Sequence, residues 1–291
     1  MISIVAISKD EPDLDVTLTE VTRQAESAGE PCEIIVVDAS QGRLDAIARS
    51  HPHVRWLAFE QPPGAGVTIP HQRNAGVRAA RGEIIVFTDA GCLPQAQWLS
   101  RLLAPLREDG ETVVAGIAVA PEGADGLYDE GTRRAATARY LEECPTINLA
   151  FRREAYDSVG GFDETFAYGS DVDFSWRLQD AGHRIRSAPE AIVTHDWGDR
   201  RRQVRRSYAY GKARARLYRK HRSRRAGLLR REPMVVVYPV FLLGLPLTLV
   251  FPLYPALLLI PAWRNRRNGA VRVLVDHLVY GAGVLAELSR R

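Results

Sequence analysis

The stretch that decides the fold is residues 83–91, Glu-Ile-Ile-Val-Phe-Thr-Asp-Ala-Gly, an apolar run that ends in a carboxylate and a glycine. Its apolar residues are continuous and mostly β-branched, which is typical of a parallel strand buried on both faces. Residues 2–7 and 33–37 have the same character. Residues 13–28 and 71–81, which separate these runs, have helical spacing or helical composition. The alternation of strands and helices predicts a doubly wound α/β sheet.

Polar side chains follow each of these strands, at the edge where ligands bind in a doubly wound sheet. The three groups are Ser8, Lys9 and Asp10, then Asp38, and then Asp89, Ala90 and Gly91. We therefore expect a nucleotide site at this edge. Taken alone, Asp38 has two interpretations: it accepts a hydrogen bond from a uracil imide or a ribose hydroxyl, or it caps the turn that follows.

The middle of the chain gives weaker patterns. They predict a helix at Gln97–Arg107, a strand at Thr112–Val119, a helix through Arg133–Leu141 and a strand at Ala191–Thr194. Three cysteines, Cys32, Cys92 and Cys144, are odd in number and widely spaced. We therefore expect buried free thiols and not a disulfide framework or a zinc site.

A second stretch, residues 160–178, reads Gly-Gly-Phe-Asp-Glu-Thr-Phe-Ala-Tyr-Gly-Ser-Asp-Val-Asp-Phe-Ser-Trp-Arg-Leu. It resembles the acceptor-side signature of family 2 glycosyltransferases, Gly-Gly-Phe-Asp-Glu followed by Gly-Glu-Asp-x-Asp-Leu-x-x-Arg. It departs from that signature at Ser170 and Phe174. Four further blocks in the family's order extend the resemblance over residues 2–198. The resemblance implies a GT-A fold, a Rossmann-like mixed sheet flanked by helices, in a membrane-associated nucleotide-diphosphosugar transferase of bacterial type.

On the donor side, residues 72–82 are similar to the family's Ala-Arg-Asn-x-Gly helix, whose arginine faces the donor diphosphate. A guanidinium at a helix N-terminus suits phosphate, although a solvated surface arginine is the alternative. The resemblance assigns nucleotide-sugar binding to Ser8, Asp10, Asp38, Arg73, Asn74, Asp89 and Ala90.

The metal site departs from the family pattern. The family usually has Asp-x-Asp where this chain has Asp89-Ala90-Gly91, and that pair holds Mg²⁺ or Mn²⁺ against the diphosphate. Asp89 is therefore expected to bind the metal alone or through water, assisted by the phosphates and by His195. The resemblance implies that His195 closes on the metal or the diphosphate, and a structural histidine is the alternative.

On the acceptor side, the resemblance implies that Asp171 is the general base, which takes the acceptor hydroxyl proton in a single inverting displacement. Asp173 is expected to orient the loop or cap the helix, and two capping aspartates are the alternative. Trp176 suits either a stacking platform or a core position. Acceptor binding is assigned to Thr146, Asn148, Trp176 and Arg177.

Residues 199–232 form a basic amphipathic collar. Of the 39 Lys and Arg residues, 15 lie between Arg200 and Arg231, which leaves 24 basic against 35 acidic side chains elsewhere. Tyrosines interleave with these cations, so nucleic acid has to be considered as a partner. Anionic membrane lipid is favoured over nucleic acid, because an apolar segment follows directly.

That apolar segment, residues 233–291, is expected to associate with a membrane. Residues 234–263 hold 30 positions without a charged side chain or histidine, which exceeds the roughly 20 that a membrane helix needs. Five prolines interrupt them, so a kinked or re-entrant hairpin is more natural than a straight span. No basic, signal-like stretch precedes the first strand, so the catalytic domain, residues 1–198, is expected at the cytoplasmic face of the membrane.

These features favour an inverting glycosyltransferase that moves one sugar from a nucleotide-diphosphate sugar, with UDP preferred, to a hydroxyl of a lipid-linked or cell-envelope acceptor. Residues 203–207 are similar to the Gln-x-x-Arg-Trp of processive members but lack the tryptophan, which disfavours repeated extension. The alternative is a catalytically silent, membrane-tethered nucleotide-sugar binder or assembly protein, because Gly91 and Ser170 remove acidic groups. A nucleotidyltransferase is disfavoured, because no Gly-rich loop follows the first strand.

Overall fold

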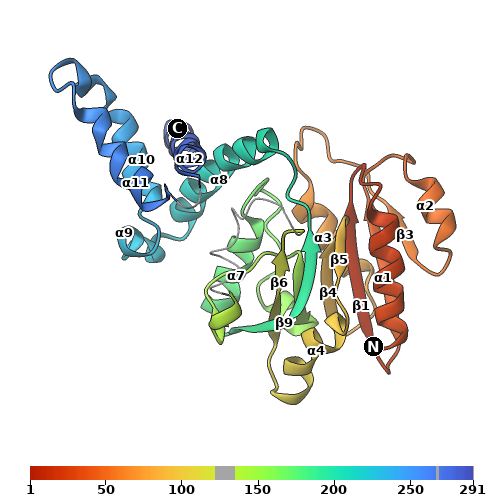
Figure 1. The fold of residues 1–291 in the computed structure, drawn as a ribbon. Helices are drawn as coiled ribbons and strands as arrows, with labels where there is room; N and C mark the ends of the chain where they lie inside the picture. The colour runs from red at the N-terminus through yellow and green to blue at the C-terminus, as the bar shows by residue number, and fades with distance from the viewer. Residues whose placement is uncertain (122–134, 267–268, 291) are drawn as a thin grey trace. The chain divides into compact units, whose positions relative to one another are not determined.

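The computed structural model describes residues 1–121, 135–266 and 269–290, and it divides into two compact units, residues 1–196 and 197–291. Figure 1 shows the sheet of the first unit and the helices of the second. The division falls two residues before the predicted end of the catalytic domain. The collar and the apolar segment, which the sequence separates, belong to one unit.

The first unit is built on one mixed sheet in the order β3-β2-β1-β4-β8-β6-β9-β5, with β7 paired to β9. β1 to β4 run parallel where they pair, β8 is antiparallel to β4 and β6, and β6 and β9 are parallel. The strands are β1 (Ile2–Ser8), β2 (Cys32–Asp38), β3 (Arg55–Ala58), β4 (Ile84–Asp89), β5 (Cys92–Pro94), β6 (Val113–Val119), β7 (Tyr140–Leu141), β8 (Asn148–Arg152) and β9 (Ile185–His195). The predicted mixed α/β fold is confirmed.

Helices cover both faces of this sheet. One face packs a core of strand residues such as Val5, Phe87 and Phe151 against α3, α6 and α7. On β8, Asn148 alternates with these core residues and meets Trp98 of α4 on the opposite face. The helices are α1 (Leu14–Glu26), α2 (Asp45–Ser50), α3 (Ile69–Ala79), α4 (Trp98–Glu108), α6 (Arg153–Ser158) and α7 (Ser170–Asp180).

Three predicted elements differ from the structure. The helix predicted through Arg133–Leu141 is wrong at its end, because Tyr140 and Leu141 pair with β9 as the strand β7, and its first two residues lie outside the described ranges. α3 ends at Ala79 rather than at Gly82. His195 is the last residue of β9 and pairs with Cys92, so it does not follow the strand.

The second unit is helical and is organised around α8 and α12. Gly211 and Gly283 let the two helices approach closely, because a Cβ at either would lie about 2 Å from a carbonyl oxygen of the other helix. Arg200 pairs with Asp276 at 2.7 Å across them. The elements are α8 (Arg200–Lys220), η1 (Arg222–Arg225), α9 (Leu228–Arg231), α10 (Met234–Leu243), η2 (Leu245–Leu249), η3 (Tyr254–Leu258), α11 (Leu259–Arg264) and α12 (Ala270–Leu288).

Residues 234–264 are thus divided among several short elements, and α12 follows them with 19 residues. Within the described ranges, none of the helices has both the length and the apolar character needed to cross a bilayer.

Candidate active site

The loops after β1 and β2 are tied together by two aspartates and their partners. Asp38 is buried, and one carboxylate oxygen accepts hydrogen bonds from the N–H and O–H of Ser40 at 3.1 and 2.5 Å. Asp10 is exposed and receives two hydrogen bonds from the Arg43 guanidinium at 2.6 and 3.0 Å. Arg43 thereby holds the pKa of the Asp10 carboxyl below its usual value. One oxygen of Asp38 therefore acts as a turn cap, and Asp10 is half of an ion pair.

Arg73 and Asp89 form an ion pair between α3 and the end of β4. Arg73 Nη2 lies 3.2 Å from Asp89 Oδ1. The Arg73 side chain is buried, and its guanidinium carbon lies 6.0 and 5.9 Å from the ring centroids of Phe87 and Phe162. Its Nε makes no hydrogen bond within the part of the chain that the structure describes. A buried guanidinium N–H without an acceptor suits an anionic ligand such as a phosphate oxygen.

Ser8 and Ala90 lie beside each other, at the neighbouring ends of β1 and β4. Ser8 Oγ is buried and likewise has no hydrogen-bond partner among the described residues. The Ser8 carbonyl accepts a hydrogen bond from Gln72 Nε2 of α3 at 3.3 Å. The Ala90 N–H donates to the carbonyl of Ile7 at 3.3 Å. The structure thus brings five predicted donor residues, Ser8, Asp38, Arg73, Asp89 and Ala90, to one edge of the sheet.

The conformation of Gly91 accounts for the missing second carboxylate of the metal motif. Its φ of +81° lies in the left-handed region, which L side chains rarely adopt. A Cβ at Gly91 would lie 3.7 Å from the carboxyl carbon of Glu11, in the loop after β1. Glu11 therefore brings a carboxyl group close to Gly91, although it comes from another segment of the chain.

His195 faces a thiol. Cys92 Sγ lies 3.6 Å from His195 Nδ1, across the β5–β9 pair. Burial strongly raises the pKa of the Cys92 thiol. The thiol therefore stays protonated at neutral pH, and it holds the histidine ring by one of its nitrogens.

A divalent metal fits this edge only with help from a ligand. Among the described residues, no group of three or more His, Cys, Asp or Glu side chains could hold a metal ion. Asp89 and Glu11 offer the carboxylate oxygens that Mg²⁺ and Mn²⁺ prefer, and the His195 imidazole suits Mn²⁺. The fit is therefore to a metal whose coordination the donor diphosphate completes.

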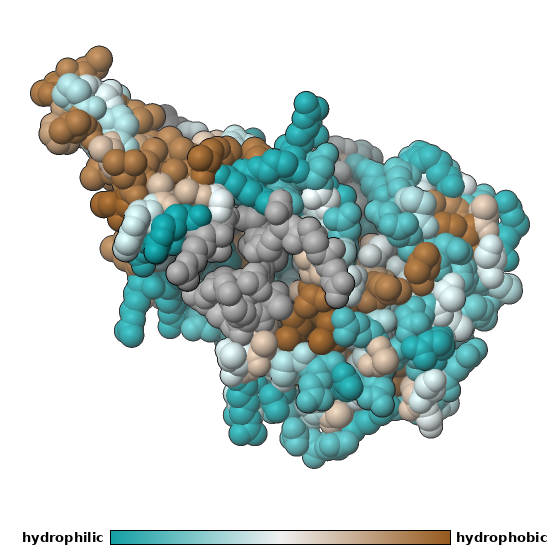
Figure 2. All heavy atoms as spheres, viewed as in Figure 1, coloured by the Kyte–Doolittle hydropathy of each residue, from teal (hydrophilic) through white to brown (hydrophobic). Residues whose placement is uncertain are grey.

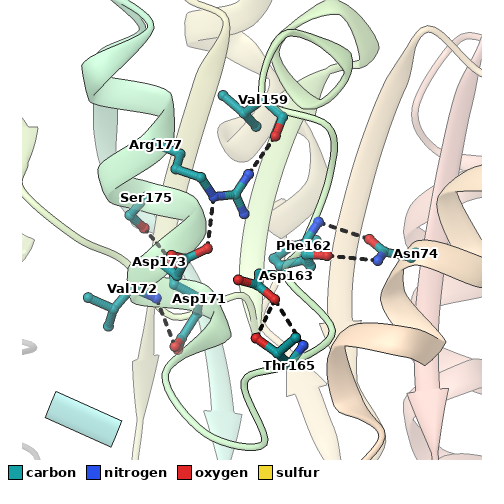
Figure 3. A network of polar contacts seen from close by, with 10 residues as sticks. All are labelled: Asn74, Val159, Phe162, Asp163, Thr165, Asp171, Val172, Asp173, Ser175 and Arg177. Atoms are coloured by element: carbon teal, nitrogen blue, oxygen red, sulfur yellow. Dashed lines mark hydrogen bonds and ion pairs between the residues drawn. The ribbon is translucent and has the colours of Figure 1, made fainter. Parts of the chain in front are cut away.

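Asn74 joins α3 to the loop that carries the acceptor signature (Figure 3). Its Nδ2 donates to the carbonyl of Phe162 and to the carboxylate of Glu164, both at 2.9 Å. Its Oδ1 accepts from the Phe162 N–H at 2.9 Å and from the Tyr156 O–H at 2.7 Å. All four hydrogen-bonding positions of this buried amide are occupied by protein. Asn74 was predicted to bind the nucleotide sugar, and its hydrogen bonds instead make it a clamp on the acceptor loop.

The two aspartates of α7 have different surroundings. Asp173 is fully buried and pairs with Arg177 at 2.8 Å, while Arg177 Nη1 donates to the carbonyl of Val159 at 2.6 Å (Figure 3). Asp171 is partly exposed in the first turn of α7, where its Oδ1 accepts the N–H of Val172 at 2.9 Å. Asp173 is thus placed to orient the loop, and Asp171 is the more accessible of the two carboxylates. The role of Asp171 as general base stays a prediction. Arg177, predicted to bind the acceptor, anchors the loop at Val159.

The other three predicted acceptor residues are buried. Asn148 donates to the carbonyls of Ile117 and Ala191 at 2.9 and 2.8 Å and accepts from the Trp98 indole at 2.8 Å, so its side chain is engaged inside the protein and does not point into a cleft. Trp176 is only 4% exposed, which corresponds to the core interpretation and not to a stacking platform. Thr146 precedes β8, and its buried Oγ1 makes no hydrogen bond within the described ranges.

Sequence reasoning missed three residues at this edge: Glu11, Ser40 and Arg43. Each lies in the loop that follows a predicted strand, at the edge of the sheet where ligands bind. Lys9 to Glu11 is a charged run directly after the first strand, which was the available signal for Glu11. The pairing of Arg43 with Asp10 depends on a contact between two loops, and no local pattern indicates it.

The parallel strands of this mixed sheet carry carboxylates and a buried arginine at their carboxyl ends, where nucleotide-binding α/β folds hold their ligands. The family model described as "Glycosyl transferase family 2" matches residues 3–170, and that described as "Glycosyl transferase family group 2" matches residues 136–263. The chain belongs to glycosyl transferase family 2.

Curated relatives agree with this family. The "Pre-mycofactocin glycosyltransferase" of Mycobacterium tuberculosis is 30% identical over 217 residues, which cover 69% of this chain and 43% of that protein. "Glycosyltransferase AglE" of Haloferax volcanii is 26% identical over 205 residues, 66% of this chain and 65% of that protein. The chain therefore spans less than two thirds of the length of either relative.

Solved structures agree with the fold. The mannosyltransferase PcManGT from Pyrobaculum calidifontis, in complex with GDP-Man and Mn²⁺, is similar with a TM-score of 0.69 at 18% identity, over 100% of this chain and 87% of that one. GalNAc-T7 with UDP, GalNAc and Mn²⁺ has a TM-score of 0.53 at 17% identity, over 74% of this chain and 50% of that one.

Proposed function

We propose that this protein transfers one sugar, with inversion, from a nucleotide-diphosphosugar to a hydroxyl of a lipid-linked or cell-envelope acceptor at the cytoplasmic face of the membrane. One observation carries the proposal: adjacent residues of α3 serve both halves of the reaction. Arg73 pairs with Asp89 on the donor side, and Asn74 holds the loop that leads to Asp171.

The chemistry follows from these positions. The acceptor oxygen forms a bond to the anomeric carbon while its proton passes to Asp171, and the bond from that carbon to the diphosphate oxygen breaks, so the diphosphate leaves with the electron pair. Arg73, with an N–H that lacks a partner, receives part of the negative charge on the diphosphate. Asp38 and Ser8 lie where the nucleoside would bind, at the ends of β2 and β1.

Mg²⁺ or Mn²⁺, when bound, would stabilise the charge on the departing diphosphate. Asp89 and Glu11 would hold it, with His195 at the edge. The two structural neighbours contain Mn²⁺, one with GDP-Man and the other with UDP, which supports a divalent ion but leaves UDP as our preferred nucleotide rather than an observed one.

The test is a panel of nucleotide diphosphates and nucleotide sugars, titrated into detergent-solubilised protein with and without Mn²⁺ and followed by calorimetry. Selective, metal-enhanced binding of one nucleotide, followed by transfer of its sugar to an extracted lipid acceptor, is the expected result. Binding without transfer to any acceptor would favour the silent binding protein. Absence of all binding would contradict the donor site itself.

A further inference from the structure

The strongest feature that the catalytic site does not use is an apolar hairpin, defined as residues 234–264. Its outer side chains are exposed, among them Leu243, Leu247, Phe251, Leu253, Leu259 and Ile260, and at its turn Leu249 and Val250 are each 88% exposed. Brown, hydrophobic spheres cover this part of the second unit in Figure 2. A continuous apolar surface of this kind marks a site that another apolar phase covers.

The hairpin is held closed by contacts between its two arms. The rings of Phe241 and Tyr254 stack with centroids 5.1 Å apart, and the Tyr254 O–H donates to the Phe241 carbonyl at 3.0 Å. Gly244 leaves room for that tyrosine, because a Cβ there would lie 2.1 Å from the Tyr254 hydroxyl oxygen. The chain therefore reverses direction after α10, and both α10 and α11 pack against α12.

Cations flank the hairpin in the sequence, before its first arm and after its second. Arg230 and Arg231 close α9 immediately before α10, and Arg264 and Arg266 follow on the return. In Figure 1, α9 lies at the end of α10 and α11 that is opposite to their turn. Trp263, which is 67% exposed, has the guanidinium of Arg266 4.7 Å from its ring centroid. Tryptophan and arginine side by side are typical of the boundary between lipid tails and headgroups.

The length of the arm indicates how deep the turn would reach. The first arm reaches the turn through α10 and η2. α10 has 10 residues, about 15 Å at roughly 1.5 Å per residue, and η2 has five, which add at most about 10 Å at roughly 2 Å per residue. An arm of about 15 to 25 Å is shorter than the roughly 30 Å hydrocarbon core of a bilayer, so the turn would stay inside the bilayer when the arginines are at the headgroups.

We propose that the apolar hairpin inserts into an anionic bilayer, entering and leaving at the same face. This inference deepens the membrane placement in the proposed function. The charges favour lipid over a second copy of the chain as the occupant. Two copies paired in parallel along their hairpins would bring arginines toward arginines, and two paired antiparallel would bring arginines toward the uncharged apolar turn, whereas anionic headgroups attract them.

The first test is flotation of the full-length protein with phosphatidylcholine vesicles, with and without phosphatidylglycerol. Leu249→Glu with Val250→Glu is expected to weaken binding by about tenfold or more, because two carboxylates would enter the hydrocarbon. Val16→Glu, at an exposed valine of α1, is the matched control and should bind as the parent does. Arg230→Glu with Arg264→Glu should remove the preference for phosphatidylglycerol. Unchanged binding of the Leu249/Val250 variant would overturn the proposal.

A second test fixes the depth and excludes a crossing. A nitroxide on Val250→Cys, in a Cys32→Ser background, should be accessible to oxygen and shielded from a water-soluble nickel chelate, whereas one on Trp263→Cys should contact the chelate. Labelling of Val250→Cys by an impermeant thiol reagent sealed inside the vesicles would show that the turn reaches the far face and would overturn the proposal. Hairpin-dependent dimers without vesicle binding would do the same. Because nucleotide binding is measured on the same preparations, a failed hairpin is distinguishable from a failed donor site.

Discussion

At the scale of single residues, burial separates the two aspartates of α7. Asp173 is buried against Arg177, whereas Asp171 is partly exposed and its carboxylate accepts the Val172 N–H of its own helix (Figure 3). Asp171→Asn removes the base and keeps the shape, so transfer should fall by about a hundred- to ten-thousandfold. Single-turnover assays measure the rate of sugar transfer, and calorimetry measures nucleotide affinity, so an effect on the chemical step is separated from an effect on binding.

The matched control for Asp171 is Asp180→Asn, an exposed aspartate at the end of the same helix. It should leave the rate within about twofold of the parent, because its carboxylate is at the surface. If Asp171→Asn transfers sugar at the parental rate, Asp171 is not the base. If it loses nucleotide affinity as well, its role lies partly in the fold.

Glu11 gives a second prediction at this scale. Its carboxyl carbon lies 3.7 Å from the position of a Cβ on Gly91, so Glu11→Gln should weaken Mn²⁺ binding in the presence of nucleotide diphosphate by about tenfold. Electron paramagnetic resonance of free Mn²⁺ measures this affinity and does not require turnover. Asp13→Asn, in the same loop, is the control and should change Mn²⁺ affinity less. Equal Mn²⁺ affinity in parent and Glu11→Gln would show that Asp89 and the phosphates suffice.

At the scale of elements, the clamp between α3 and the acceptor loop rests on one amide. Asn74→Ala would leave the Phe162 N–H and carbonyl and the Tyr156 hydroxyl without their partner. Each unsatisfied buried group costs about 1–3 kcal/mol, so the three together should lower the free energy of unfolding of the first unit by about 3–9 kcal/mol. Urea unfolding of the full chain measures it.

The comparison that isolates the clamp is Tyr156→Phe, which removes one hydrogen bond and keeps the aromatic packing. It should cost about 1 kcal/mol. A fall in stability for Asn74→Ala no larger than that of Tyr156→Phe would mean that the loop holds without the clamp.

We expect the stability of the second unit to depend on pH through His277. His277 Nδ1 lies 2.7 Å from the Tyr238 hydroxyl, between α12 and α10, and burial lowers the pKa of His277, with a weaker opposing effect from Asp276. A lowered folded pKa means that the unfolded chain binds the proton first as the pH falls. The stability contribution is therefore complete above about pH 6.5 and is lost below it.

Thermal unfolding in detergent should accordingly show a transition temperature that falls between neutral and mildly acid pH. His277→Gln should flatten this dependence, and His53→Gln, at an exposed histidine of the first unit, should not. An unchanged slope for His277→Gln would exclude this histidine as the cause.

At the scale of the whole molecule, the parts predicted best from sequence were those whose signal is local. β1, β2 and β4 were predicted nearly to the residue, because strands buried on both faces are continuously apolar. β3, β5 and β7 have four, three and two residues, and they exist only because a neighbouring strand supplies their register. No local pattern encodes that.

The candidate site divides in the same way. Arg73 and Asp89 were predicted for the donor edge, and the structure pairs them. The positions of Asn74 and Asn148 differ from the prediction, because their partners lie up to 90 residues away and only tertiary packing brings them together. Side chains that satisfy buried backbone groups and side chains that await a ligand look alike in a sequence.

We also expect the start of α8 to limit how many sugars the protein adds to one acceptor. Gln203 and Arg206, the residues that resemble the processive motif, donate to the backbone carbonyls of Gly198 and Trp197. With these side chains holding the start of α8, we expect a product that carries one added sugar. Mass spectrometry of the product formed at excess donor measures this, and a ladder of longer products would contradict it.

Because Arg73 and Asn74 lie in one turn of α3, the donor and the acceptor are expected to influence each other's binding. Arg73 and Asn74 are consecutive on a rigid helix, and one touches the carboxylate of the donor side while the other holds the acceptor loop. If the donor draws Arg73 away from Asp89 and shifts α3 with it, the Asn74 clamp would move with the helix, and the binding of the two ligands would be thermodynamically linked. Linkage is reciprocal, so whatever factor the donor adds to acceptor affinity, the acceptor must return to donor affinity.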